Sequence, residues 1–232
     1  MTKSGGGIVD RVVSIALATA ALAVAGSVVY RELVPVSARL DAGASAPETG
    51  KYFSDWRSLL GFVRYVGDSS SEVRLIEFTD LECPACRRFH EQILPELRKA
   101  LGSTFSVGMV HLPLAGHRFA KTAAHAAECA ADQGRFGEFV DLTMTKQDSI
   151  GLKSWGSFAQ DAGVADEETF ADCVTRPRLP PAVDSGVAAA ARLGIHATPT
   201  VLVNGWHVPF YSVPEVTRVI RDIGAGRRPY PD

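Results

Sequence analysis

Residues 73 to 86 read VRLIEFTDLECPAC, and this stretch decides the fold of the 232-residue chain. Its first part, Val73 to Phe78, is dominated by apolar residues, which predicts a buried strand. Apolar residues then recur at helical spacing from Cys83 to Leu101, where Pro95 is expected to kink the helix. The first two cysteines of the chain therefore lie at a junction between a strand and a helix.

These two cysteines are three residues apart in the sequence Cys83-Pro84-Ala85-Cys86. Residues i and i+3 of a helix lie about 5 to 6 Å apart on one face, which suits a disulfide. The unpaired N–H groups and the positive dipole end of a helix N-terminus stabilise a thiolate, so Cys83 is the expected nucleophile. Pro84 suits the first helical turn because an N–H there would be unbonded anyway. The pair is therefore expected to be redox-active.

Two residues outside the cysteine motif support this interpretation. Glu77 interrupts the apolar strand, and strand alternation places its side chain on the same face as Leu75, which should be buried. Burial should raise the pKa of this carboxyl, so that it can take a proton from Cys86 when that thiol attacks a mixed disulfide. Pro199, in Thr198-Pro199-Thr200, opens a late strand, where proline is tolerated at the first position or in a cis turn. A purely structural Glu77 and a trans edge proline are the alternatives.

The rest of the domain predicts an α/β arrangement. A second strand at Phe105 to Leu114 follows the first helix, and the right-handed crossover implies a parallel pair. Ala-rich helices fill Arg118 to Leu193 and read as an insertion. The other expected elements are a short helix with an edge strand at 52–66, a hairpin at 200–208 around Asn204-Gly205, and a closing helix at 214–223.

This combination resembles the thioredoxin superfamily, and the stretch from Val73 to Gly205 is similar to its DsbA-like group. The resemblance rests on the C-x-x-C at the strand-helix junction, the acid six residues before the first cysteine, the late Thr-Pro and the helical insertion. Glu77-Phe78-Thr79-Asp80 and the segment from Thr198 to Gly205 carry it in detail. The implied fold is a thioredoxin-like α/β domain over 51–232 with an inserted helical subdomain at about 118–193.

The resemblance also implies roles for the site residues. Pro199 should be cis and pack against the cysteine pair. The backbone of Thr198, together with Pro84, Ala85 and Pro199, should bind an extended substrate peptide as an added strand. One position departs from the pattern, because DsbA proper carries a histidine where Ala85 stands, and that histidine helps to stabilise the thiolate.

The implied activity is oxidation of cysteine pairs in exported proteins, with reoxidation by a membrane quinone-linked partner of the DsbB or VKOR kind. A strong oxidant is one whose reduced form is stabilised, so the loss of the histidine at Ala85 bears directly on oxidising strength. A thiol reductase or disulfide isomerase that uses Cys83 and Cys86 is the alternative enzyme. A copper(I)-binding chaperone is the alternative from another class, because soft thiolates suit that ion.

The N-terminal residues predict export. The uncharged run from Val12 to Tyr30 has 19 residues, which as a helix would span roughly 28 Å, close to the bilayer core. We expect residues 1–35 to be a single-pass membrane anchor, with a signal peptide cleaved after Ala23-Val24-Ala25 as the alternative. Residues 36–50 are rich in Ala, Ser, Gly and Pro and predict a flexible linker. Either way the catalytic domain would be extracytoplasmic, on the cell membrane or in the periplasm.

The other cysteines and the charge restrict the remaining possibilities. All four cysteines follow the apolar segment, and Cys129 and Cys173 are interpreted as a structural disulfide within the insertion. They are not spaced like a second zinc-binding pair, so neither a metal nor another cofactor is expected.

A formal net charge of −2 without a basic cluster argues against a nucleic-acid partner, and a monomer is expected. The other histidines are read as packed or surface residues: His90, His111, His117, His125, His196 and His207.

Overall fold

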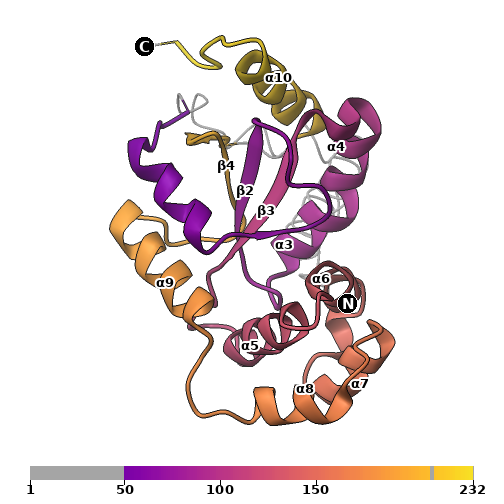
Figure 1. The fold of residues 1–232 in the computed structure, drawn as a ribbon. Helices are drawn as coiled ribbons and strands as arrows, with labels where there is room; N and C mark the ends of the chain where they lie inside the picture. Colours follow the sequence, from indigo (N-terminus) through magenta and orange to yellow (C-terminus); the bar gives the residue numbers. More distant parts are fainter. Residues whose placement is uncertain (1–49, 210–211, 232) are drawn as a thin grey trace, which may run out of the picture. The chain divides into compact units, whose positions relative to one another are not determined.

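The computed structural model describes residues 50–209 and 212–231, whose strands form one five-stranded sheet in the order β1-β3-β2-β4-β5 (Figure 1). The central pair, β2 and β3, is parallel, and the other three neighbouring pairs are antiparallel. The parallel pair predicted from the crossover is therefore confirmed. The strands are β1 (Arg64–Tyr65), β2 (Arg74–Thr79), β3 (Ser106–His111), β4 (Thr200–Val203) and β5 (Trp206–His207).

One face of the sheet is covered by α4 (Leu94–Leu101) and α10 (Val213–Gly224). Leu75 of β2 is fully buried there, in the same core as Leu97 and Val219. Strand alternation sends Glu77 to this face as well. The buried acid predicted from the sequence therefore lies on the side of the sheet that carries the helix after the cysteines.

The opposite face is covered by the 3-10 helix η1 (Ser54–Gly61) and by α9 (Pro181–Leu193), which appear together to the left of the sheet in Figure 1. Phe78 of β2 packs in this core with Leu59 and Ala189. The sequence predicts that α9 is the last part of the helical insertion. In the structure, however, the buried side of α9 packs against the sheet. Gly186 makes this possible, because a Cβ there would lie 2.3 Å from the backbone oxygen of His111.

The helix that follows the cysteines is not continuous. It consists of α3 (Pro84–Arg88), a π-helical turn η2 (Phe89–Ile93) and α4. The Leu94 N–H bonds the Phe89 carbonyl, five residues back, and Pro95 then occupies the first turn of α4. The extra residue of a π turn lets the chain pass a proline that has no N–H to donate. The interruption expected at Pro95 thus takes the form of a π turn.

The helical insertion contains four helices, whose core, with Phe139, Phe158 and Phe170 fully or almost fully buried, also includes Cys83 and Cys86. The first two of these helices are separated at Gly134, whose φ is 71°. The helices are α5 (Ala120–Ala131), α6 (Phe136–Thr145), α7 (Trp155–Asp161) and α8 (Glu167–Val174), with the short 3-10 turn η4 (Gln147–Ser149) after α6. Another 3-10 turn, η3 (Gly102–Thr104), lies outside the insertion, between α4 and β3.

The predicted hairpin joins β4 and β5 through Asn204 and Gly205, whose φ values are 44° and 89°. Positive φ at both positions is the geometry that an Asn-Gly hairpin turn requires. Within the described residues, no helix combines the length and apolar character needed to cross a bilayer. The predicted anchor, residues 1–35, and the linker up to residue 49 lie outside the described part of the chain.

Candidate active site

Cys83 lies at the N-terminus of α3, in the N-cap position with extended φ and ψ. Its backbone N–H donates to the Asp80 carbonyl at 3.0 Å, and its own carbonyl accepts the Arg87 N–H at 3.1 Å. Both cysteines of the motif are free thiols; Cys83 is 6% exposed and Cys86 is 0% exposed. A substrate can therefore reach the first sulfur more easily than the second, as the sequence predicts.

The environment lowers the pKa of Cys83 from 9.0 to about 5. The hydrogen bond from the Cys86 thiol contributes most, and the Thr198 side chain and the backbone N–H groups of Ala85 and Cys86 act in the same direction, whereas burial opposes them. The helix N-terminus was expected to be the main cause, but it ranks below the neighbouring thiol. Cys83 is thus a thiolate at neutral pH.

Cys86 behaves in the opposite way. Burial raises its pKa most, and the hydrogen bond to Cys83 and the negative charge of Glu77 raise it further. When the pair is reduced, the proton therefore stays on Cys86 while Cys83 is ionised. Two sulfurs in one helical turn thus have different chemical roles, because Cys86 is buried and donates to Cys83, which also faces the N–H groups of the helix start.

Glu77 lies on β2 beneath the pair, and its side chain is completely buried. Desolvation raises the pKa of Glu77 to about 8, which the neighbouring Thr79 hydroxyl and Cys86 thiol only partly offset. Neither carboxyl oxygen has a partner in hydrogen-bond geometry among the described residues. A buried carboxyl with a pKa near ambient pH can exchange a proton with a neighbouring thiol in either direction.

The Thr198–Pro199 peptide bond is cis, as the resemblance implied. The Cys83 thiol lies 3.5 Å from the Thr198 carbonyl oxygen, so the two distant segments meet at the reactive sulfur. A groove of about 440 Å³ runs beside them and is lined by Ala85, Arg88, Phe89, Gln92, Ile93, Thr198 and Pro199. It gathers three of the four residues expected to bind substrate, whereas Pro84 is exposed and lies outside its lining.

Larger cavities exist elsewhere, of about 810 and 620 Å³. The first lies beside Arg98 and Asp141, and the second beside Arg64 and the Cys173 sulfur. None of the three is lined by Cys83 or Cys86, but the groove of about 440 Å³ is the one lined by Thr198, whose carbonyl oxygen meets the Cys83 thiol.

Sequence reasoning missed three residues that shape the loop before Cys83. The Asp80 carboxylate accepts the N–H groups of Glu82 and Leu114, each at 2.8 Å, and His117 Nδ1 lies 2.7 Å from the same carboxylate. The Gln147 side chain donates to the Leu81 and Cys83 carbonyls at 2.9 and 3.1 Å; it comes from η4 of the insertion. Asp80 could have been suspected as an acid directly after a buried strand, but nothing local marks Gln147 or His117.

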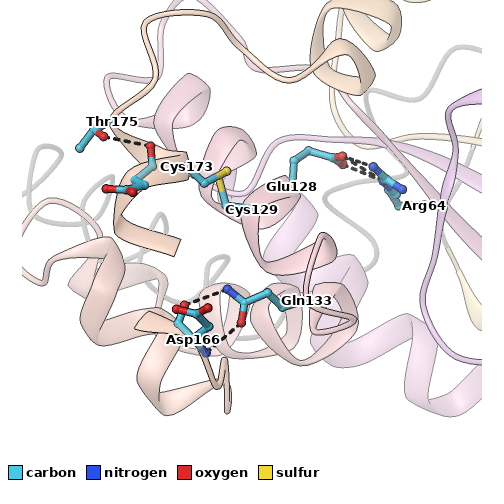
Figure 2. Close-up of a disulfide and its surroundings, with 8 residues drawn as sticks. Arg64, Glu128, Cys129, Gln133, Asp166, Cys173 and Thr175 are labelled. Carbon is cyan, nitrogen blue, oxygen red and sulfur yellow. Dashed lines mark hydrogen bonds and ion pairs between the residues drawn. A yellow bond between two sulfur atoms is a disulfide. The ribbon is translucent and has the colours of Figure 1, made fainter. Parts of the chain in front are cut away.

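The second cysteine pair lies in the insertion, and the predicted disulfide is present (Figure 2). Cys129 of α5 and Cys173 of α8 have Cα atoms 5.8 Å apart. Gln133, in the turn after α5, exchanges two hydrogen bonds with the backbone of Asp166, at the start of α8, and so ties the same two helices together. A ring nitrogen of His125 and the two sulfurs all lie within 4.8 Å of one another, but cysteines joined to each other offer no thiolate to a metal ion.

The chain was compared with known proteins. A family model described as Thioredoxin matches residues 62–221. The chain is 30% identical over 163 residues to the Na(+)/H(+) antiporter NhaA of Herminiimonas arsenicoxydans, covering 70% of this chain and 26% of that protein. It therefore spans about a quarter of the length of the antiporters that it matches.

Two further proteins connect the chain with disulfide chemistry. It is 23% identical over 161 residues to a Rickettsia prowazekii protein provisionally named a protein-disulfide oxidoreductase, covering 67% of this chain and 59% of that one. The crystal structure of Wolbachia pipientis α-DsbA1 has the same fold, with a TM-score of 0.58 at 19% identity, covering 71% of this chain and 92% of that one. Together with the family match, these findings confirm the expected resemblance: the chain belongs to the thioredoxin family and has the fold of its DsbA-like thiol:disulfide oxidoreductases.

Proposed function

We propose that the protein is an extracytoplasmic thiol-disulfide oxidoreductase that oxidises cysteine pairs in exported proteins. The observation that carries the proposal is the opposite ionisation of two adjacent sulfurs, with Cys83 acidic and Cys86 buried and protonated. A thiolate is both the nucleophile and the better leaving group in thiol-disulfide exchange. The cis Pro199 and the groove beside it supply a place for the substrate chain.

The reaction starts from the oxidised Cys83–Cys86 pair. A substrate thiolate attacks the Cys83 sulfur, the bond between the two cysteines breaks, and Cys86 leaves and takes a proton from Glu77. A second substrate thiolate then attacks the substrate sulfur of the mixed disulfide, and Cys83 leaves as a thiolate. The substrate has lost two electrons and gained a disulfide, and the enzyme pair is reduced.

The oxidising direction follows from the stability of the reduced form. With a pKa of about 5, Cys83 favours its thiolate at pH 7 by a factor of about 10², which raises the reduction potential by about 60 mV over that of an ordinary thiol. This acidity lies between those of thioredoxin, roughly 7, and DsbA, roughly 3.5. We therefore expect an oxidant weaker than DsbA, in keeping with Ala85 in the place of its histidine.

The location and the partners belong to the same proposal. An anchor at residues 1–35 would hold the catalytic domain outside the cytoplasm, where a quinone-linked membrane protein of the DsbB or VKOR kind could reoxidise Cys83 and Cys86. A membrane-impermeant maleimide should then label Cys83 in intact cells after mild reduction. Labelling that requires lysis would contradict the external location.

The direction is tested by equilibrating the purified domain with glutathione buffers and titrating the Cys83–Cys86 pair. We expect a potential between about −220 and −120 mV at pH 7, together with oxidation of a reduced, unfolded test protein. A potential well below about −220 mV would overturn the oxidising direction. Tight copper(I) binding without any oxidation of the test protein would instead favour a chaperone.

One observation favours the reverse direction as a second candidate. Glu77 beside Cys86 can remove the proton from that buried thiol, which is the step a reductase needs when it resolves a mixed disulfide. The same pair would then act as a reductase or an isomerase. The measured potential separates the two candidates, because the chemistry of the site is otherwise identical.

A further inference from the structure

The inference concerns the loop that follows β3. Because β2 and β3 are parallel, the segments after both strands leave the sheet at the same edge, and the Leu112 N–H donates to the Thr79 carbonyl at 2.8 Å. The segment after β2 leads directly to Cys83. The segment after β3 therefore brings its side chains beside the reactive cysteine, and one of them is His117.

Asp80 joins these two segments. Its side chain is fully buried and takes one N–H from each segment, those of Glu82 and Leu114, while its carbonyl accepts the Cys83 N–H. The same carboxylate lies 2.7 Å from His117 Nδ1, and the histidine is 26% exposed. The position of the His117 ring is thus set by a residue that also sets the backbone at Cys83.

The charged groups that act most strongly on His117 are negative. They are Asp80, Cys83 and Glu82, and Glu82 is oriented by the Phe119 N–H at 2.5 Å, whereas the adjacent cation, Arg118, is exposed. Burial acts to lower the pKa of His117, but the hydrogen bond and charge of Asp80 and the charges of Cys83 and Glu82 together raise it above its ordinary value. His117 therefore keeps its proton to a higher pH than an ordinary histidine.

We propose that His117, held by Asp80, is a positioning residue that supplies positive charge to the Cys83 thiolate in place of the histidine that Ala85 replaces. The charge comes from the next loop of the sheet instead of from the cysteine motif. This inference rests on the proposed function only in requiring an acidic Cys83. If it is right, the Cys83 thiol is less acidic at pH values at which His117 has lost its proton.

The experiment compares the full protein with His117→Asn and His117→Arg. Asparagine can still donate to Asp80 but carries no charge, whereas arginine keeps the charge. The acidity of Cys83 is measured from the pH dependence of iodoacetamide alkylation, and the equilibrium with glutathione is measured in parallel. We expect roughly tenfold lower acidity of Cys83 in His117→Asn, an equal shift in the glutathione equilibrium, and largely restored values in His117→Arg.

A second His–Asp pair provides the matched control. His90 Nε2 lies 2.7 Å from Asp141 of α6, the same separation as at His117, but this pair links η2 to the insertion and does not touch the loop before Cys83. His90→Asn should leave both readouts unchanged, and denaturant unfolding of each variant checks that it is folded. If His117→Asn leaves an acidic Cys83 unaltered, the inference is overturned and the proposed function stands. An ordinary pKa of Cys83 in the unaltered protein would overturn both.

Discussion

The domain holds two cysteine pairs that differ in every respect relevant to redox chemistry. Cys83 and Cys86 are neighbours in one helical turn and are free thiols, whereas Cys129 and Cys173 are separated by 44 residues and joined in a disulfide. Both pairs lie in one hydrophobic core, and the negative charge of the buried Glu77 acts on Cys86 of the first pair. The same functional group thus serves chemistry in one region and stability in the other.

The comparison shows that local electrostatics, not burial, separates the two roles. All four sulfurs are buried, and Cys83 and Cys173 are equally exposed at 6%. Only Cys83 has a helix N-terminus, a donor thiol and the Thr198 side chain around it. A disulfide that closes a long loop also restricts the unfolded chain more than one that closes a single turn. The second pair is therefore suited to remain closed.

The largest expected effect separates the pairs by activity. Cys83→Ser should abolish oxidation of a reduced test protein, because the attacked sulfur is gone. Cys86→Ser should form a mixed disulfide at Cys83 and stop there, which non-reducing mass spectrometry would detect as an adduct. A double variant, Cys129→Ala with Cys173→Ala, should keep the activity; loss of activity in a folded double variant would erase the distinction between the pairs.

The next effect concerns stability, for which the second cysteine pair is expected to matter. The Cys129→Ala and Cys173→Ala double variant should lose about 4 kcal/mol of unfolding free energy, the value expected in the chain-entropy model for a loop of this length. Urea unfolding without reductant, with Cys83→Ser and Cys86→Ser in both proteins, measures it. A stability equal to that of the unaltered protein would show that helix packing alone holds α5 to α8.

Glu77 sharpens the comparison, because an acid of this kind accompanies only the reactive pair. In Glu77→Gln the release of glutathione from a mixed disulfide at Cys83 should slow on the order of 10²-fold, since Cys86 has lost its proton acceptor. The rise in rate centred near pH 8 should disappear as well. Glu91→Gln, at an exposed position of η2, is the control and should behave like the unaltered protein. An unchanged pH profile in Glu77→Gln would leave Glu77 with a structural role only.

The reduced and oxidised forms should differ in their pH-dependent stability. The pKa of Cys83 is lowered on folding, so the reduced protein gains stability that is complete above pH 9 and is lost as the pH falls through about 5. The oxidised protein has no such titration. Thermal or urea unfolding of both forms at several pH values gives the gap in stability, reduced form minus oxidised form. This gap should fall between pH 7 and pH 5. A constant gap would mean that Cys83 is not acidic.

The smallest expected effect tests whether the insertion influences the reactive pair. Gln147→Leu removes the two hydrogen bonds to the Leu81 and Cys83 carbonyls and should cost about 1 kcal/mol of stability for each. The acidity of Cys83 should change little, because neither bond reaches its sulfur. The alkylation profile measures this. A shift as large as the one expected for His117→Asn would show that η4 also tunes the active site.

Local signals account for what could be predicted. The strand before Cys83, the start of α3 at Pro84 and the turn at Asn204-Gly205 each depend on a few consecutive residues, and the structure confirms them. The π turn before Pro95 and the return of α9 to the sheet were not predicted. Both depend on packing between distant elements, which hydrophobic periodicity does not specify.

The sequence by itself determined the chemistry that is possible, because two cysteines at a helix start, an acid on a buried strand face and a proline before a late strand are local facts. Only the tertiary structure decided how these groups act on one another. The parallel pairing of β2 and β3 brings His117 to Asp80, whose carbonyl binds the Cys83 N–H, and the carbonyl of Thr198, next to the cis Pro199, meets the Cys83 sulfur. The reason is physical: thiol acidity depends on donors and charges within a few ångströms, and for Cys83 these include Thr198, far along the chain, beside the local donors of Ala85 and Cys86.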